Sequence, residues 1–292
     1  MKRYLTILLL LNVVAMTASA REVFPINEGW RFFFKSEKTS DNARHVTLPH
    51  SWNTDPLAQG YWLETTGSYQ NGMYIPVEWA SKRLFVKFYG VQSVADLFVN
   101  GYHVGTHRGG ATAFTFEITD KIRFGSDNSM LVVVSNSSRD DVLPTSTDMN
   151  LYGGIYRDIS LIVVSKNHIA LGHFGDTGVK ITPVLKDGKA DIRVETIVEG
   201  EGAVSVELQD AAGSIVARAE GADAQLHLDA PHLWDGVKDP YLYTCVVRLS
   251  SDGTVVDEVS TRVGLRTFSV DSRNGFFLNG RPYPLPGVSR HQ

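Results

Sequence analysis

Residues 95–106 read ADLFVNGYHVGT, and this stretch predicts the kind of fold to which the chain belongs. Two runs, Ala95–Val99 and His103–Thr106, flank the pair Asn100-Gly101. Asn-Gly between two such runs is the strongest short-range signal for a two-residue β-hairpin, because both residues tolerate positive φ. We therefore expect antiparallel sheet at the centre of the first half of the chain.

The strand pattern continues on both sides of this hairpin. Residues Arg83–Tyr89 alternate, whereas Met130–Ser135 and Asp158–Val164 are almost continuously apolar. Continuous apolar runs of this length are typical of strands in the middle of a sandwich core, and helical periodicity is nearly absent. The sequence predicts a β-sandwich over residues 22–164.

A second group of strands follows from about Lys166. Turn pairs such as Asp187-Gly188 and Asp252-Gly253 separate its apolar runs. About seven short strands in about 100 residues is the strand count of an immunoglobulin-like sandwich, which we expect over residues 165–268. The predicted strands are Val179–Leu185, Ala190–Val198, Val204–Asp210, Ile215–Ala219, Ala224–Leu228, Leu242–Leu249 and Val255–Val263.

The last segment, residues 269–292, fits neither sandwich. Gly275–Leu278, the pair Asn279-Gly280 and Tyr283–Val288 predict a further hairpin whose second strand runs toward the C-terminal end. Because the chain ends inside this pattern, we expect it to be part of a longer protein.

Composition and charge describe a folded, slightly acidic protein. The 292 residues are 43% hydrophobic and 21% charged, with a formal net charge of −4 and a pI near 6.1. This balance is typical of globular domains, and without a basic stripe nucleic acid is not the expected partner. Cys245 is the only cysteine. The domains must therefore fold without a disulfide, and a buried, unreactive thiol is expected.

The first twenty residues have the pattern of a secretory signal. Lys2 and Arg3 precede an apolar run, Leu5–Met16, and Ala18-Ser19-Ala20 offers the small residues that a signal peptidase selects. The apolar run is too short for a stable bilayer span, so an uncleaved anchor is the less favoured alternative. We expect residues 1–20 to be removed, leaving a secreted or periplasmic protein without a membrane span.

One stretch combines aromatic and polar residues in a way that suits carbohydrate. Sugars bind flat aromatic faces together with fixed hydrogen-bond partners. The alternative is that these rings fill the sandwich core, since large aromatics are commonly buried. The residues concerned are Tyr61, Trp62, Tyr69, Tyr74 and Trp79, with Glu64, Asn71 and Gly72 among them.

Asp148 is the second candidate for a functional side chain. It lies in the polar loop Thr145–Arg157, and Gly153-Gly154 allows that loop to turn sharply. The alternative is an ordinary exposed aspartate. His103 and His107 could share one hairpin, but two ligands do not make a metal site, so no metal is expected in this chain.

The segments of the mature chain, taken in order, resemble glycoside hydrolase family 2, the β-galactosidase, β-glucuronidase and β-mannosidase group. The resemblance runs through nearly all of the mature chain. It rests on INEGWRF (26–32), VTLPHSW (46–52), GMYIP (72–76), LFVNGYHVG (97–105), LYGGIYRDISL (151–161), PHLWDGVKDPYLY (231–243), VGLRTF (263–268) and GFFLNGRPYPLPGVSRH (275–291).

The resemblance implies a three-part architecture and a chemistry. Residues 22–164 would form a sugar-binding jelly-roll, residues 165–268 an immunoglobulin-like sandwich, and residues 269–292 the start of a truncated (β/α)8 barrel. The family performs retaining hydrolysis with two glutamates on barrel strands, about 5–5.5 Å apart. Both glutamates would lie beyond Gln292, so no acid or nucleophile can be named and the chain alone is expected to be inactive.

Four residues are candidates for substrate contact, and three of them follow from the resemblance. Asp148 matches the aspartate that the galactosidase branch directs at a sugar hydroxyl or nearby cation. Trp62 is instead chosen from the aromatic stretch itself, where it would supply an aromatic face. Arg290 and His291 match an Arg-His pair at the end of the first barrel strand, where barrels place substrate-facing groups. The chain departs from the family pattern at Pro284 and Pro286, where the family more often has a basic residue before Gly-Val. Proline removes a ladder hydrogen bond, so strand pairing at this point is less expected.

The expected partner is a β-galactoside-like carbohydrate, and an oligomer is compatible with the sequence. The chain would need no cofactor, although Mg²⁺ and Na⁺ could serve the full-length enzyme. Galactosidase specificity is favoured mainly through Asp148, which leaves β-glucuronidase and β-mannosidase specificity open. The alternative to an enzyme is a stand-alone carbohydrate-binding β-sandwich protein. Such a protein would have no reason to keep an apolar strand ending in Arg290 and His291.

Overall fold

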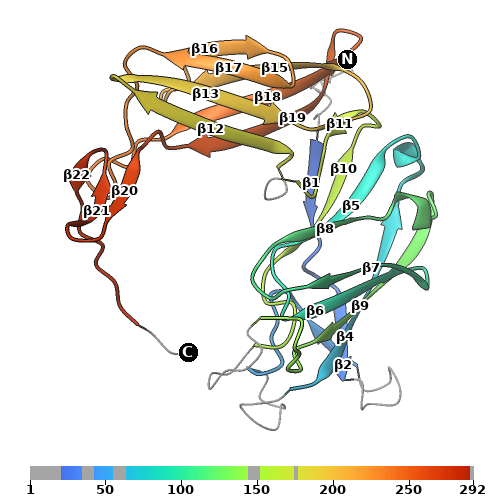
Figure 1. Cartoon of the computed structure of the whole chain (residues 1–292). Helices are drawn as coiled ribbons and strands as arrows, with labels where there is room; N and C mark the ends of the chain where they lie inside the picture. Colours follow the sequence, from blue (N-terminus) through green and yellow to red (C-terminus); the bar gives the residue numbers. More distant parts are fainter. Residues whose placement is uncertain (1–20, 35–42, 55–63, 144–151, 174–176, 290–292) are drawn as a thin grey trace, which may run out of the picture.

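The computed structural model describes residues 21–34, 43–54, 64–143, 152–173 and 177–289, and these residues form an almost purely β-structure. Figure 1 shows two sandwiches joined by a short junction, followed by a small third sheet. Two short 3₁₀ turns, η2 (Val77–Trp79) and η3 (Thr119–Lys121), interrupt the first sandwich. In the part of the chain that is described, no helix is long and apolar enough to cross a membrane.

The first sandwich packs a four-stranded sheet on a six-stranded sheet, with antiparallel pairing throughout. Its core includes the fully buried Trp30, Trp52 and Tyr69. The first sheet has the order β1 (Arg21–Pro25), β10 (Ile159–Val164), β5 (Arg83–Phe88), β8 (Phe114–Glu117). The second has the order β3 (Arg44–Val46), β2 (Trp30–Phe34), β4 (Thr66–Ile75), β9 (Ser126–Ser135), β6 (Val94–Val99), β7 (Tyr102–Arg108).

The hairpin predicted from ADLFVNGYHVGT is confirmed. Strands β6 and β7 pair in antiparallel register, and Asn100 and Gly101 connect them with φ of 52° and 83°. Positive φ at both turn positions is what a type I′ connection requires, and it matches the right-handed twist of the two strands. The six-stranded sheet therefore carries this turn at its β6–β7 end.

The second sandwich has the strand count expected of an immunoglobulin-like domain. All seven predicted runs are strands, and Cys245 is buried in the core between the two sheets, as predicted. The three-stranded sheet has the order β12 (Val179–Lys186), β13 (Lys189–Thr196), β17 (Asp223–Leu228). The four-stranded sheet has the order β16 (Ile215–Glu220), β15 (Ala203–Gln209), β18 (Tyr243–Ser251), β19 (Thr254–Val263).

A buried ion pair joins the two sandwiches. Arg21 of β1 donates to both carboxylate oxygens of Asp257 in β19, from Nε at 3.1 Å and from Nη2 at 2.6 Å. Asp257 is fully buried and also accepts the N–H of Ile169 at 2.7 Å. Ile169 belongs to β11 (His168–Ile169), which pairs with β14 (Val198–Glu199) at the start of the second sandwich. One carboxylate therefore connects three segments of the chain.

The same junction buries the outer face of strand β5. Phe85 is only 7% exposed although its neighbours Leu84 and Val86 face the opposite way into the sandwich core. The Phe85 ring lies 5.5 Å from the imidazole of His168, which is itself buried. Alternation along β5 predicts that Phe85 faces water, but the contact between the two sandwiches buries it.

A third, three-stranded sheet follows the second sandwich. It consists of β20 (Phe268–Asp271), β21 (Gly275–Leu278) and β22 (Arg281–Pro282), with the predicted Asn279-Gly280 turn between the last two. The Asn279 amide donates to the carbonyl oxygen of Trp234 at 3.0 Å, and Arg281 pairs with Asp235 at 2.7 Å. These contacts fix the sheet to the loop before β18.

The expected strand Tyr283–Val288 is wrong for this structure. Strand β22 stops at Pro282, and the N–H of Tyr283 makes one more bond, to the Phe276 carbonyl oxygen at 2.9 Å. No strand is assigned to residues 283–289. Two prolines, Pro284 and Pro286, remove N–H donors from this segment, and Val288 is 96% exposed. The segment runs on from the third sheet without forming a strand (Figure 1).

Candidate functional site

The four predicted substrate-binding residues, Trp62, Asp148, Arg290 and His291, lie outside the described residues. Trp62 belongs to segment 55–63 and Asp148 to segment 144–151, both inserted in the first sandwich. The structure describes the residues on either side of these two segments. Their contacts define where the candidate site is attached.

The residues just before segment 55–63 are bonded to those just after segment 144–151. The Asn53 side chain accepts the N–H of Gly153 at 2.6 Å, and the N–H of Trp52 donates to the Gly153 carbonyl oxygen at 3.1 Å. One step further in, the N–H of His50 donates to the carbonyl oxygen of Ile155 at 2.8 Å. The residues before segment 55–63 are therefore paired with those after segment 144–151.

A second set of bonds joins the other two ends. The Asn136 side chain accepts the N–H of Thr65 at 2.8 Å, and the backbone N–H of Asn136 returns a bond to the Thr65 carbonyl oxygen. Glu64 accepts the N–H of Ser138 at 3.0 Å. Two separate sets of bonds thus hold the described residues that flank the two segments. We take these flanking residues of the first sandwich as the reference points for the candidate site.

Trp52 is the packing anchor of that group. Its side chain is fully buried and stacks on Phe32 at 5.9 Å, with an interplanar angle of 19°. A Cβ at Gly153 would lie 2.0 Å from the indole ring of Trp52, so only glycine allows the chain to approach this closely. The motif VTLPHSW (46–52) includes this tryptophan, but no local pattern predicts that it packs against residue 153.

The two neighbouring glycines have different roles. Gly154 has a φ of 128°, and a Cβ there would meet the His50 carbonyl oxygen and the Tyr69 hydroxyl, each at 2.6 Å. Gly153 has no such backbone angle, and its requirement is space. The sequence interpretation that both glycines provide unusual backbone angles is therefore correct only for Gly154.

The other predicted aromatic residues divide between core and surface. Tyr69 is fully buried, and its hydroxyl lies 2.7 Å from Nδ1 of His50. Trp79 is partly buried against the core, and its ring lies 5.3 Å from that of Phe24. Tyr74 is 59% exposed. The core alternative is correct for Tyr69, whereas Tyr74 stays available for contact.

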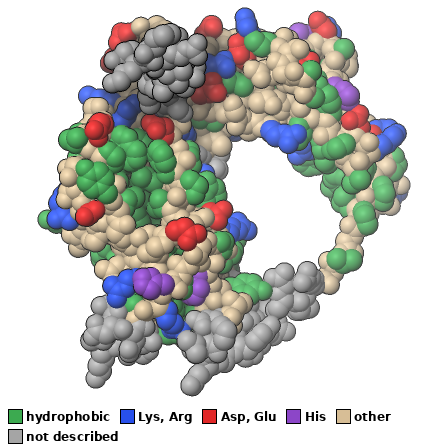
Figure 2. Space-filling model, turned by 180° about the vertical axis from the view of Figure 1, so that it is seen from behind, with side chains coloured by type: hydrophobic (Ala, Val, Ile, Leu, Met, Phe, Trp, Pro, Cys, Tyr) green, Lys and Arg blue, Asp and Glu red, His purple; other side chains and the backbone are tan. Residues whose placement is uncertain are grey.

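Hydrophobic side chains gather over one face of the first sandwich, as Figure 2 shows. Val23 and Phe24 of β1 and Val77 after β4 are among the exposed hydrophobic residues of this sandwich. Contiguous apolar surface of this kind is a contact surface rather than a source of acid–base chemistry. None of the predicted site residues is described on it.

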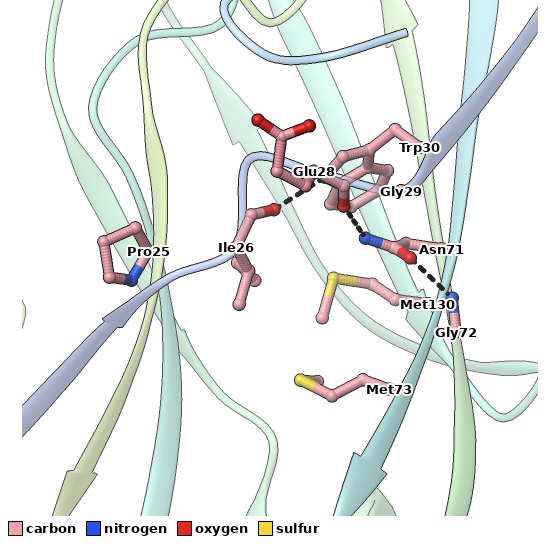
Figure 3. Close-up of a pocket in the computed structure, with 9 residues that line it drawn as sticks. All are labelled: Pro25, Ile26, Glu28, Gly29, Trp30, Asn71, Gly72, Met73 and Met130. Atoms are coloured by element: carbon pink, nitrogen blue, oxygen red, sulfur yellow. Dashed lines mark hydrogen bonds between the residues drawn. The ribbon is translucent and has the colours of Figure 1, made fainter. Parts of the chain in front are cut away.

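A pocket of about 360 Å³ opens between β1 and the six-stranded sheet (Figure 3). Ile26, Met73 and Met130 form its apolar wall, and the Glu28 carboxylate stands at the rim, where it accepts the Thr47 hydroxyl at 2.8 Å. Asn71 is tied to the Glu28 carbonyl oxygen at 2.9 Å. The pocket is lined by one carboxylate and by no exposed aromatic ring, so it has few groups that would bind a sugar.

Charged residues beside segment 144–151 are paired with each other. Asp141 accepts Nε and Nη2 of Arg139 at 2.7 and 3.0 Å, and Arg108 approaches the same carboxylate at 3.2 Å. The bond from Arg139 is the main cause that holds the pKa of Asp141 below its ordinary value. Asp141 is therefore ionised at neutral pH and poorly suited to donate a proton.

The described residues supply no cluster of three or more His, Cys, Asp or Glu side chains that could hold a metal ion. His103 lies 3.2 Å from Asp96, whereas His107 is directed to the Gly109 carbonyl oxygen at 3.0 Å. The two histidines of the hairpin thus have separate partners.

The described residues form two linked β-sandwiches followed by a small third sheet. The profile described as "Glycosyl hydrolases family 2, sugar binding domain" matches residues 26–165, and "Glycosyl hydrolases family 2" matches residues 173–266. The chain belongs to glycoside hydrolase family 2.

Relatives in this family are longer than the chain. A β-glucuronidase of Bacteroides fragilis is 35% identical over 97% of this chain and 43% of its own length. A β-galactosidase of Thermoanaerobacter pseudethanolicus is 29% identical over 93% of this chain and 39% of its own length. The chain therefore spans about two fifths of the length of these curated relatives.

A solved structure agrees with this assignment. Bacteroides uniformis β-glucuronidase 2, covalently bound to cyclophellitol-6-carboxylate aziridine, superposes with a TM-score of 0.81 at 28% identity. The match covers 93% of this chain and 36% of that chain. The resemblance stated from the motifs is confirmed at the level of the family.

Proposed function

We propose that this chain is the substrate-contacting N-terminal portion of a secreted retaining β-glycosidase. The observation that carries the proposal is the order of the two family matches, 26–165 and 173–266, along the chain. The described residues beside segments 55–63 and 144–151 are bonded in pairs, Asn53 with Gly153 and Thr65 with Asn136. The bounds 22–164, 165–268 and 269–292 for its three parts belong to the proposal.

The proposed division of labour follows from the chemistry of glycoside hydrolysis. Retaining hydrolysis needs one carboxyl as acid/base and a second as nucleophile, about 5–5.5 Å apart. We assign neither to this chain, which would instead bind and orient the sugar. Asp148 would accept a sugar hydroxyl, Trp62 would cover a ring face, and Arg290 and His291 would contact substrate from the barrel side. The chain alone is proposed to be catalytically inactive.

The sugar specificity has two candidates. A β-galactoside follows from the interpretation of Asp148. A β-glucuronide is supported by the 35% identity to the Bacteroides fragilis β-glucuronidase, against 29% to the Thermoanaerobacter β-galactosidase. Initial rates on p-nitrophenyl β-galactoside and β-glucuronide, measured with the product of the complete gene, distinguish them. Faster hydrolysis of the glucuronide would contradict the galactosidase assignment.

Replacement of Asp148 tests the site itself. A hydrogen bond to a charged group contributes roughly 1.5–3 kcal/mol, so Asp148→Ala should lower kcat/KM of the intact enzyme roughly 10- to 150-fold. Asp140→Ala is the matched control, because it removes an exposed aspartate from the neighbouring segment. Equal kcat/KM for the two variants would contradict the assigned role of Asp148.

The mass of the mature protein made from its native gene tests two further parts of the proposal. A (β/α)8 barrel adds about 250 residues, so the mass should lie far above the 32.3 kDa of this chain. N-terminal sequencing should begin at Arg21 if residues 1–20 are a cleaved signal. A mass just below 32.3 kDa, with carbohydrate binding and no hydrolysis, would favour the stand-alone binding protein.

A further inference from the structure

The second sandwich has an open flank. Strand β12 is the edge of its three-stranded sheet and β19 the edge of its four-stranded sheet, so both carry unpaired backbone groups. A groove of about 490 Å³ lies along this flank and is lined by residues of both strands. Figure 1 shows β12 and β19 along the same side of the sandwich. The groove has the size of a small-ligand site.

The floor of this β12–β19 groove is apolar. Val179, Ile181 and Pro183 of β12 line it, and they face Val263 of β19. Pro183 also interrupts the row of N–H donors along the edge of β12. An added peptide strand needs that row, so the groove is poorly suited to β-strand addition.

The polar groups of the groove are cationic or hydroxyl-bearing. Arg262 and Arg266 both line it, together with the side chains of Thr177 and Thr261. None of the lining residues is Asp or Glu, although the chain has 32 acidic residues against 28 basic ones. The groove is therefore a local site of positive charge on an acidic chain.

The two guanidinium groups differ in how they are held. Arg266 lies over the Trp234 ring at 4.9 Å and donates through Nη1 to the Gly264 carbonyl oxygen at 3.2 Å. These contacts fix its orientation and use one of the five N–H donors of the guanidinium. Arg262 is exposed and has no hydrogen-bond or ion-pair partner among the described residues. It can accept an incoming anion without first breaking a salt bridge.

The chemistry of these groups identifies the ligand. Guanidinium forks match the two oxygens of a carboxylate or sulfate. The Thr261 hydroxyl and strand-edge backbone groups suit sugar hydroxyls, whereas the Thr177 hydroxyl is already bonded to the backbone of Val179. The exposed Phe268 ring offers a flat face for C–H bonds. We propose that the β12–β19 groove binds a saccharide that carries a carboxylate or sulfate group. The groove involves no residue of segments 55–63 or 144–151, so this proposal does not depend on the proposed glycosidase function.

Calorimetric titration of the purified chain with three sugar probes tests this assignment. The probes are methyl 1-thio-β-D-glucuronide, galactose 6-sulfate and neutral methyl β-D-galactoside. We expect the anionic sugars to bind and the neutral one not to bind. Binding of both anionic probes supports a shared anion site, and binding of one identifies the source of the charge. Equal binding of the neutral galactoside would overturn the proposal.

The variant Arg262→Gln should weaken binding of the anionic sugars at least about tenfold, because it removes a charge-assisted, two-oxygen contact. Its control is Arg273→Gln, which removes the same charge from an exposed arginine in the β20–β21 turn. Equal loss in the two variants would mean that only net charge matters. Inorganic sulfate or hexaglutamate binding as tightly as the sugars would also refute saccharide recognition.

Discussion

Replacing Asp257 with alanine is expected to cost the chain about 3–5 kcal/mol of unfolding free energy, because it breaks a buried ion pair from one side. The Asp257 carboxylate is fully buried and accepts two bonds from Arg21 and one from the N–H of Ile169. The Arg21 side chain is only 13% exposed. Alanine would leave this guanidinium without its counter-ion and the Ile169 N–H without an acceptor.

Urea denaturation followed by tryptophan fluorescence and circular dichroism measures this loss. The double variant Arg21→Met/Asp257→Ala should lose less than the sum of the single variants, by about 0.5–3 kcal/mol, because it leaves no unpaired charge. Asp223→Ala is the control. It breaks an Arg–Asp pair with Arg193 at similar distances, 2.7 Å for both bonds, but on the exposed surface, and should have little effect. A loss below about 1 kcal/mol for Asp257→Ala, or strict additivity, would refute the reasoning.

Three further predictions concern single residues. Gly153→Ala should destabilise the first sandwich by about 1–3 kcal/mol in the same urea assay, since its Cβ would overlap Trp52; an unchanged midpoint would show that Trp52 can move. Burial is the main cause that lowers the pKa of His168 below its ordinary 6.5, so the unfolded chain binds the proton more readily. Stability is then complete above about pH 6.5 and falls as the pH drops below it; His168→Asn should reduce this slope, and an identical pH profile would contradict the assignment. Burial raises the pKa of the Cys245 thiol to about 12, so Ellman's reagent should label it only after unfolding, and rapid labelling of the folded chain would disprove its burial.

The sequence by itself determined the strands of both sandwiches. Runs such as Val179–Leu185 and Val255–Val263 appear as β12 and β19, because side chains alternate between core and water along each strand. The turns were equally readable, since Asn100-Gly101 and Asp252-Gly253 adopt the positive φ that few other residue pairs tolerate. The family followed from motifs in order. Local chemistry was sufficient for each of these conclusions.

The candidate site was predictable only in part. Asp148 and Trp62 could be selected by residue type. No local pattern predicts that Asn53 and Gly153, which lie beside their two segments, are bonded to each other. The same limit applied to the segment after β22. Its apolar residues suggested a strand, but a strand needs continued pairing with a partner edge, and the pairing with β21 does not continue past the bond from Tyr283 to Phe276.

Only the tertiary structure decided how the two sandwiches meet and where an open charged groove remains. Arg21 and Asp257 are 236 positions apart and pair because folding brings β1 against β19. Arg262 resembles any exposed arginine in the sequence, yet it lines the same groove as Pro183, which lies on a different sheet. Periodicity reports which face of a strand is buried, whereas the partner of that face depends on contacts between residues distant in the chain.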